Sequence, residues 1–222
     1  MKVLELFAGS RSVGKVAESM GCKVFSLDIH PFDGIDLVGD ILDVTVEQIP
    51  FVPDVIWASP PCAFFSVASI GHHWHKDHTP KTENAKLGVR IVGKTLEIIN
   101  YFERWNPQIK WFMENPRGKL RKLEVVQGIA RETVMYCQYG DMRMKPTDIW
   151  SNYIAGAFNP NGWQPRPLCF NGNPNCHHES APRGSKTGTQ GIKGSYDRSR
   201  IPSDLIKEIF FTFPLFMYMV ML

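Results

Sequence analysis

The sequence lacks a targeting segment and a membrane-spanning segment. Met1 leads directly into Val3-Leu4-Glu5-Leu6-Phe7, without the basic leader, long apolar stretch and cleavage site of a signal peptide. The apolar run over residues 210–222 is too short to cross a bilayer. We therefore expect a cytoplasmic protein that has no membrane association and no evident obligate protein partner.

The sequence also has little excess charge of either sign. Its 25 Lys and Arg residues and 22 Asp and Glu residues leave a formal net charge of +3, too small to indicate a polyanionic partner by itself. Basic residues nevertheless gather at two places. These are Arg117, Lys119, Arg121 and Lys122, and then Arg183, Lys186, Lys193, Arg198 and Arg200. Charge alone therefore neither requires nor excludes a nucleic-acid partner.

Cysteine is scarce and odd in number, which argues against a framework of disulfides. The five cysteines are Cys22, Cys62, Cys137, Cys169 and Cys176. Scattered cysteines in a cytoplasmic protein indicate metal binding or catalysis before disulfides. We expect these thiols to be reduced.

Residues 2–28 have the pattern of a strand, a turn with Gly9, a helix and a second strand that ends at Asp28. Such a unit can hold a nucleotide-like ligand, because the turn approaches the ligand closely and the carboxylate bonds a ribose diol. Strand and helix patterns continue to alternate along the chain. This alternation predicts an α/β fold of the Rossmann-like kind, with a doubly wound, mostly parallel sheet.

Two further predicted strands each deliver a polar side chain and then meet proline. The apolar run over residues 51–58 is followed by Ser59-Pro60-Pro61-Cys62, and the run over 109–113 by Glu114-Asn115-Pro116. Ligands in open α/β sheets bind beyond the carboxyl ends of the strands, where a rigidly held thiol can act as a nucleophile. The alternatives are a buried structural cysteine at Cys62 and an ordinary strand-end carboxylate at Glu114.

Residues 63–83 have few periodic apolar positions and predict a mobile loop or lid. The loop contains His72, His73, His75 and His78, but no helix or strand pattern fixes their spacing. A solvated or DNA-facing loop is therefore favoured over a metal site.

Residues 159–195 are rich in Gly, Pro, Asn and Ser, and predict a loop-rich insertion that cannot build its own core. Cys169, Cys176 and His177 lie within it, and a zinc ion would give this segment order, with Cys137 or His178 as the fourth ligand. Incidental thiols are the alternative. We expect a core over residues 1–158, the insertion over 159–200, and a C-terminal helix with an apolar tail over 201–222.

The motifs occur in one order along the first 150 or so residues: Phe7-Ala8-Gly9, Asp28, Pro60-Pro61-Cys62, Glu114-Asn115-Pro116 and Tyr139-Gly140. Together they resemble the C5-cytosine DNA methyltransferases, and most resemble a short, phage-type or prokaryotic member. The resemblance implies the S-adenosylmethionine-dependent methyltransferase fold, DNA as the partner, and a prokaryotic or phage-infected cell as the setting.

The resemblance also implies residue roles. Cys62 would attack cytosine C6 to activate C5, Glu114 would bond the edge of the flipped base, and Arg143 would contact a phosphate or the base. The residues that we assign to S-adenosylmethionine are Phe7, Ala8, Gly9, Ser10, Asp28, Ile29, Asp40, Ile41 and Pro60. The residues that we assign to zinc are Cys169, Cys176, His177 and Cys137.

The chain departs from the family pattern at three places. Ser10-Arg11-Ser12 replaces the second glycine of the first motif, Arg143 and Lys145 stand where the family has a Gln and paired arginines, and the large target-recognition domain is missing. Two other functions therefore stay open beside DNA methylation. One is a nucleic-acid-binding homologue that has lost turnover, and the other is C5 methylation of cytosine in RNA.

Overall fold

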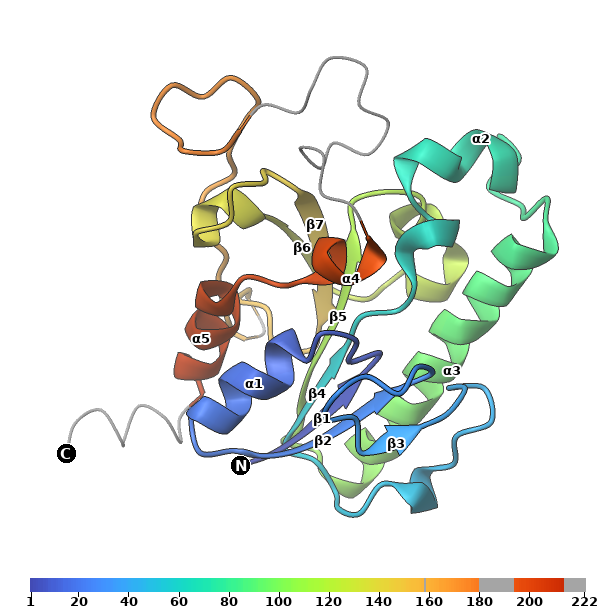
Figure 1. Ribbon diagram of the computed structural model, residues 1–222, viewed down its shortest axis with the longest axis vertical. Coiled ribbons are helices and arrows are strands. Elements are labelled where there is room, and N and C mark those ends of the chain that lie inside the picture. The colour runs from blue at the N-terminus through green and yellow to red at the C-terminus, as the bar shows by residue number, and fades with distance from the viewer. Residues whose placement is uncertain (158, 180–193, 214–222) are drawn as a thin grey trace.

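The structure, a computed structural model, describes residues 1–157, 159–179 and 194–213 (Figure 1). Within these residues the central element is a seven-stranded sheet with the strand order β3-β2-β1-β4-β5-β7-β6. The first five strands in this order, β3, β2, β1, β4 and β5, pair in parallel, and β7 lies antiparallel to its two neighbours, β5 and β6. The strands are β1 (Lys2–Leu6), β2 (Lys23–Asp28), β3 (Leu37–Val38), β4 (Val55–Ala58), β5 (Lys110–Pro116), β6 (Arg131–Met135) and β7 (Pro146–Ser151).

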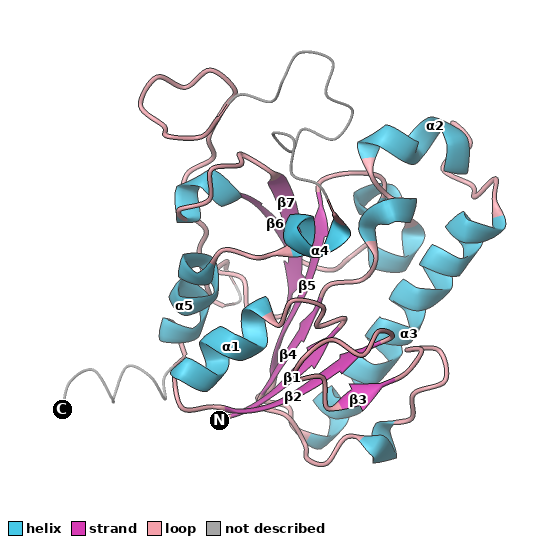
Figure 2. Ribbon diagram, viewed as in Figure 1, coloured by secondary structure: helices cyan, strands magenta, loops and turns pink. Residues whose placement is uncertain are grey.

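Helices cover both faces of the sheet. The long helix α3 (Glu83–Trp105) lies on one face, and α1 (Ser12–Ser19) and α5 (Ser203–Phe211) lie together on the other (Figure 2). Two short helices, α2 (Ile70–His73) and α4 (Ser195–Ser199), lie near the end of the sheet to which β4 and β5 run. The predicted doubly wound, mostly parallel α/β sheet is confirmed.

Strand β4 shows why the parallel strands are apolar throughout. Its Ile56 and Ala58 side chains pack into the core on the α3 side, whereas Val55 and Trp57 pack into the core beneath α1 and α5. Successive side chains of a strand point to opposite faces, so a strand that is covered on both faces needs apolar residues at every position. The sequence therefore gives a continuous apolar run here, without alternation.

Three predicted elements differ in extent from those in the structure. The strand expected over 109–113 continues to Pro116, because β7 pairs with it and places Glu114 opposite Ile149. The apolar pattern over residues 35–41 predicts a third strand, which is only Leu37–Val38 in the structure. The pattern over 134–140 predicts a strand through Cys137, but β6 ends at Met135 and a 3₁₀ helix, η6 (Tyr136–Tyr139), follows. Glu114 is therefore a residue within a strand and does not follow its end.

The segment 63–83 is more firmly packed than the predicted lid. It holds short helical turns, and the rings of Phe65 and Trp74 are buried and stacked with centroids 6.0 Å apart. The Trp74 indole N–H also donates to the Phe64 carbonyl over 2.7 Å. Two buried aromatic side chains thus anchor this segment to the core beside α3.

The first part of the predicted apolar tail belongs to the core. Phe210, in the last turn of α5, and Phe213, just after the helix, are buried with ring centroids 5.4 Å apart. Residues 214–222 of this tail and residues 180–193 of the predicted insertion lie outside the described residues. Across the part of the chain that is described, no helix has the length and apolar character needed to cross a bilayer.

Candidate active site

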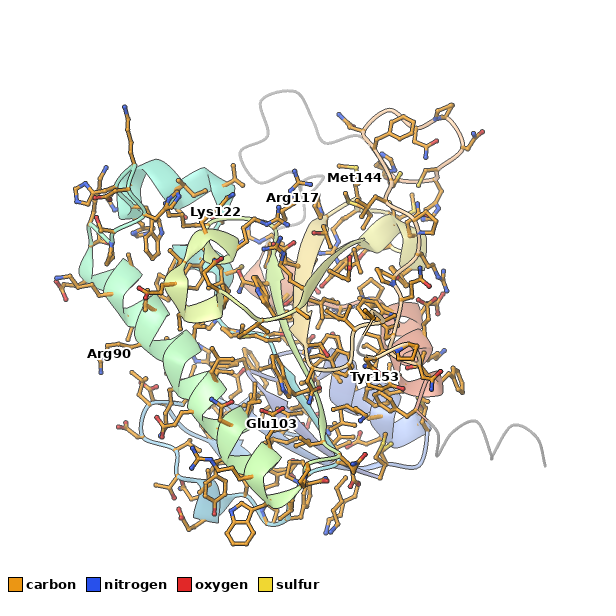
Figure 3. The ribbon with its side chains drawn as sticks, turned by 180° about the vertical axis from the view of Figure 1, so that it is seen from behind. Arg90, Glu103, Arg117, Lys122, Met144 and Tyr153 are labelled. Atoms are coloured by element: carbon orange, nitrogen blue, oxygen red, sulfur yellow. The ribbon has the colours of Figure 1, made fainter. Side chains whose placement is uncertain are left out.

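A large cavity opens at the carboxyl ends of β1, β4 and β5. The strand order reverses between β1 and β4, which is the point of an open α/β sheet where ligands bind. The cavity has a volume of about 960 Å³. Arg117 and Met144, which lie at this end of the molecule in Figure 3, are part of its wall. Its lining also includes Phe7, Ala8, Ser10, Pro60, Cys62, Glu114, Lys145 and Arg198.

Cys62 is held at the cavity surface by the loop that follows β4. The Ser59 N–H continues the sheet by donating to the Leu6 carbonyl over 3.2 Å. The buried side-chain amide of Asn115 donates to the Pro60 carbonyl over 2.8 Å, and so fixes this loop to β5. Cys62 then begins a 3₁₀ helix, η2 (Cys62–Phe64). Its exposed side chain is consequently supported from two neighbouring strands.

A close approach of two backbones also fixes the position of Cys62. The Lys119 N–H donates to the Phe65 carbonyl over 2.8 Å, which joins the loop after β5 to the turn that begins at Cys62. A Cβ atom at Gly118 would lie 2.4 Å from the same carbonyl oxygen. Only glycine allows this contact, so Gly118 is required by the approach of the two loops.

Glu114 is buried, and its carboxylate is positioned by two residues from the β6–β7 hairpin. The Tyr136 hydroxyl donates to Glu114 Oε1 over 3.0 Å, and Lys145 Nζ lies 4.0 Å from the same oxygen. Burial, and next the Glu114 charge, raise the pKa of Tyr136 well above its usual value, so this phenol keeps its proton. Because Oε1 accepts the Tyr136 hydrogen bond, Oε2 is the oxygen free to carry a proton or meet a ligand.

The charges around Cys62 have opposing effects on its thiol. The cavity walls exclude much of the surrounding water, and this burial, followed by the Glu114 carboxylate, raises the pKa of Cys62. The Lys145 and Arg198 cations act in the opposite direction. The pKa of Lys145 is itself lowered by burial, although Glu114 partly offsets that effect. Because the effects that raise its pKa are the larger ones, Cys62 is a protonated thiol in this structure.

The turn after β1 is held by Asp28. One oxygen of its carboxylate accepts the Gly9 N–H over 2.8 Å, and the other accepts the His30 N–H over 2.9 Å. Phe7 and Gly9 both have positive φ, of 60° and 48°, so the turn places backbone at the cavity edge. Asp28 lies behind this turn and does not line the cavity.

A buried carboxylate beneath the turn fixes the start of α1. Glu5 accepts the Val13 N–H over 3.1 Å and the Ser26 hydroxyl over 3.0 Å. Burial raises the pKa of Glu5 to about 7. Arg11, which takes the place where the family pattern has glycine, adopts φ 54° and pairs with Glu18 and Ser26. Arg11, in the altered first motif, thus belongs to a network of side chains with Glu18, Ser26 and Glu5.

One comparison with known proteins decides the family. The chain is 30% identical over an alignment of 220 positions to a probable DNA (cytosine-5)-methyltransferase of Frog virus 3, and the match covers 94% of this chain and 98% of that protein. This chain belongs to the DNA (cytosine-5)-methyltransferase family. The resemblance drawn from its motifs is therefore confirmed. No family model matches the chain.

Solved methyltransferase structures are also similar to parts of the chain. An Entamoeba histolytica methyltransferase, EhMeth, matches 68% of this chain at 13% identity with a TM-score of 0.49, and a Schizosaccharomyces pombe (S. pombe) Dnmt2 methyltransferase matches 68% at 14% with a TM-score of 0.41. The chain spans 52% and 48% of those two proteins, about half of each.

Some of the predicted cofactor residues of the methyltransferase lie at the cavity and others do not. Phe7, Ala8, Ser10 and Pro60 are in its lining, next to Cys62. By contrast, Ile29 is 57% exposed, the Asp40 carboxylate accepts the Leu42 N–H, and Ile41 is buried in the core. The structure therefore brings together the residues after β1 and β4, and leaves those after β2 and β3 outside the cavity wall.

Arg143 does not occupy the place that the family resemblance implies. It is 4% exposed, pairs with Asp141, and donates to the carbonyls of Arg198 over 3.1 Å and Arg200 over 3.2 Å. Its donors are thus turned toward the segment that carries Arg198, away from any base or phosphate. In this arrangement Arg143 supports this part of the wall, and its contact with a substrate phosphate or base stays a prediction.

The basic cluster over 117–122 is only partly free to meet DNA. Arg121 forms an ion pair with the fully buried Asp148, and Lys119 is buried with its Nζ 2.6 Å from His78 Nδ1. Arg117, in the cavity lining, and Lys122 remain exposed. The expected contact with a nucleic-acid backbone therefore falls to these two residues.

The predicted metal ligands lie close together with one exchange. Cys137, Cys169, Cys176 and His178 form a group whose ligand atoms lie within 4.8 Å of one another. The neighbouring His177 points elsewhere, with its Nε2 3.1 Å from the Asp141 carbonyl oxygen. In this geometry His178 takes the position that the sequence analysis gave to His177.

Sequence reasoning missed three residues that shape the site, namely Tyr136, Asn115 as a support of the Pro60 loop, and Glu5. Tyr136 and Glu5 stand in apolar strand patterns that gave no reason to separate them from core residues. Asn115 was noticed only as part of the Glu114 motif. Their partners come from distant strands, so only the sheet order brings the partners together.

The charges around Cys62 predict how its reactivity depends on pH. Alkylation of Cys62 by iodoacetamide should require a higher pH than alkylation of an unstructured peptide thiol. Glu114→Gln should lower the pKa of Cys62 because a like charge is removed, and Lys145→Met should raise it because a cation is removed. Peptide mass spectrometry of the full chain, sampled over time at several pH values, measures both shifts. An alkylation midpoint below that of the free peptide would contradict the electrostatic description.

Proposed function

We propose that this family member transfers a methyl group from S-adenosylmethionine to C5 of a cytosine in DNA, through a covalent adduct at Cys62. The observation that supports this most directly is that Cys62 and Glu114, from adjacent parallel strands, face one cavity. A homologue that only binds nucleic acid would have no need for a nucleophile and a supported carboxyl group at the same opening.

The cavity has the size and lining that S-adenosylmethionine requires. Small-molecule sites commonly have volumes of about 300 to 1,000 Å³, and this cavity, at about 960 Å³, has its backbone turn at the switch point of the sheet. The turn from Phe7 to Ser10 and the residue Pro60 would hold the cofactor. When bound, S-adenosylmethionine supplies an electrophilic methyl group.

In the proposed reaction the Cys62 thiol first loses its proton to water. Lys145 and Arg198 stabilise the thiolate, whose electron pair forms a bond to cytosine C6. The ring electrons move toward C5, which becomes nucleophilic and takes up the methyl group. Loss of the C5 proton to water or a nearby base then returns electrons to the ring, and the bond from Cys62 to C6 breaks.

Glu114 stabilises the charge that reaches the ring in this reaction. Its Oε1 accepts the Tyr136 hydrogen bond, so Oε2 would carry the proton that bonds N3 of the base. Lys145 lies over the Tyr136 ring, with Nζ 4.5 Å from the centroid, and contributes a positive charge to the same corner of the cavity. These fixed groups act where negative charge develops and require little rearrangement as it does so.

The cytosine must leave the duplex to reach this cavity, because C6 of a stacked base is inaccessible. The exposed cations Arg117 and Lys122 lie near the opening, where they would contact phosphates on either side of the flipped nucleotide. Arg117 lines the cavity and is also exposed to solvent, so it can contact both the cavity and a nucleic acid outside it.

Cys62→Ser should abolish methyl transfer while leaving S-adenosylmethionine affinity nearly unchanged, because the hydroxyl is a far weaker nucleophile than a thiolate. The measurement is transfer of labelled methyl to duplex DNA and to RNA, followed by nucleoside analysis. DNA with 5-fluorocytosine should trap the wild-type chain at Cys62, because fluorine cannot leave as the C5 proton does. Turnover on normal DNA without any trapped adduct would overturn the covalent mechanism, and 5-methylcytosine in RNA alone would reassign the substrate.

Tyr136→Phe should lower kcat about 10-fold or more, since a hydrogen bond to a charged group contributes about 1.5 kcal/mol or more. The Michaelis constant for S-adenosylmethionine should stay constant, because Tyr136 contacts Glu114 and not the turn after β1. Tyr153→Phe is the matched control, because this buried hydroxyl bonds the Asn161 and Thr212 carbonyls instead. Equal effects of both substitutions would indicate that Tyr136 acts only on stability.

Asp28→Ala should weaken S-adenosylmethionine binding by about 1 to 3 kcal/mol, the usual cost of leaving buried polar groups unpaired. The reason is that the Gly9 and His30 N–H groups lose their acceptor and the turn loosens. Asp36→Ala is the control, because Asp36 supports the Ser26 N–H away from the turn. Isothermal calorimetry compares the two, and an unchanged affinity in Asp28→Ala would remove Asp28 from the site.

A further inference from the structure

Three of the four cysteines other than Cys62 meet at one place beside the catalytic cavity. Cys137 comes from η6, and Cys169, Cys176 and His178 come from residues 164–179, which hold no helix or strand. The four ligand atoms lie within 4.8 Å of one another, and Cys169 Sγ is 3.6 Å from His178 Nδ1. Thiols of a cytoplasmic protein that gather with a histidine are typical of a metal site.

We propose that Cys137, Cys169, Cys176 and His178 bind one structural zinc ion. Tetrahedral zinc with bonds of about 2.3 Å to sulfur and about 2.0 Å to nitrogen places its ligand atoms about 3.5 to 4 Å apart. Here Cys169 Sγ and His178 Nδ1 lie 3.6 Å apart and all four ligand atoms lie within 4.8 Å of one another, and three sulfurs with one imidazole nitrogen form a common zinc ligand set. The proposal stands on this geometry and does not depend on methyl transfer.

Amide groups around the sulfurs fit a thiolate centre. Gln138 Nε2 lies 3.9 Å from the sulfurs of both Cys137 and Cys176, and Asn173 Nδ2 donates to Cys169 Sγ over 3.4 Å. Three thiolates on a single dication leave excess negative charge on sulfur, and such donors stabilise it.

The segment that supplies three of the ligands has almost no core of its own. Between 164 and 179 Cys169 is the one buried residue, while its neighbours Leu168 and Phe170 are 58% and 61% exposed. Hydrogen bonds hold its two ends, at Arg166 and at the Glu179 N–H. The metal would supply the order that burial cannot give to the residues between them.

The same centre supports one wall of the catalytic cavity. Met135 and Met144 pack against the cysteines and also line the cavity. Asn171, His178 and Glu179, from the ligand-bearing segment, lie in the same wall. Loss of zinc should therefore disturb the wall that faces the base more than the turn after β1, where S-adenosylmethionine is proposed to bind.

Metal analysis of the full chain tests the site without an activity assay. About one zinc per chain is expected, in line with one four-ligand site. Cys169→Ser, Cys176→Ser and His178→Asn should lose it on dialysis. His177→Asn and Cys22→Ala should retain it, because His177 bonds a backbone carbonyl and Cys22 is buried elsewhere. Cys62→Ser should also retain it, which separates this site from the catalytic thiol.

Replacement of zinc by cobalt(II) gives a second test. The cobalt form should show the intense absorption of sulfur-to-cobalt charge transfer and of a tetrahedral ion, and limited proteolysis should cleave 167–178 faster once a chelator has removed the metal. Any of three results would overturn the proposal. The full chain could bind no metal, or His178→Asn could hold zinc as well as His177→Asn. Alternatively, two of the three thiols could be found as a disulfide that persists in the presence of a reductant.

Discussion

The geometry of the site depends on the parallel pairing of β4 with β5. In this register Ala58 lies opposite Met113, so the chain that follows β4 and the Glu114 side chain emerge at the same edge of the sheet. The Asn115 amide then bonds the Pro60 carbonyl across the two strands. Because Pro60 and Pro61 restrict the backbone, this hydrogen bond and those of the Ser59 and Lys119 N–H groups fix the direction in which Cys62 leaves the strand.

The antiparallel hairpin of β6 and β7 completes the corner that the parallel strands begin. Its strand β7 extends β5 beyond the point where a parallel neighbour would end, and the residues before and after its turn, Tyr136 and Lys145, meet at Glu114. The same turn carries Arg143, which holds the Arg198 segment over the cavity. The sequence of this strand pair gives no sign of a functional role, but its turn positions three charged or polar groups at the site.

Local patterns were sufficient to predict most elements, because each strand of the parallel part is buried on both faces and each long helix is amphipathic. They were also sufficient to place Cys62 and the turn at Gly9 at one edge, since both follow such strands. Local patterns say nothing of where Asp40, Ile41 and Arg143 lie relative to the cavity, because the roles of these residues were carried over from the family resemblance. Residues after β2 and β3 lie away from the cavity wall, and the burial of Arg143 depends on carbonyls more than fifty positions away, which no local pattern contains.

The exchange of His178 for His177 has a similar origin. Adjacent side chains in an extended segment point in different directions, so His177 and His178 cannot both face the cysteine sulfurs. Which of them faces Cys169 is set by the anchor of the segment at the Glu179 N–H, a bond to the Met142 carbonyl over 3.0 Å. Spacing along the chain identifies the pair, but only the path of the segment across the hairpin turn selects the member.

The charges at the centre of the site connect the two halves of the proposed reaction. An ionised Glu114 opposes formation of the Cys62 thiolate, because the two negative charges would share a corner that is largely shielded from water. A proton on Glu114 Oε2, where it would bond N3 of the base, removes that opposition and leaves Lys145 and Arg198 to favour the thiolate. If Glu114 takes a proton from water as it bonds N3 of an arriving cytosine, the arrival of the base would thus also activate Cys62. The nucleophile would be formed mainly when its substrate is in place, and the resting thiol would be protected from other electrophiles.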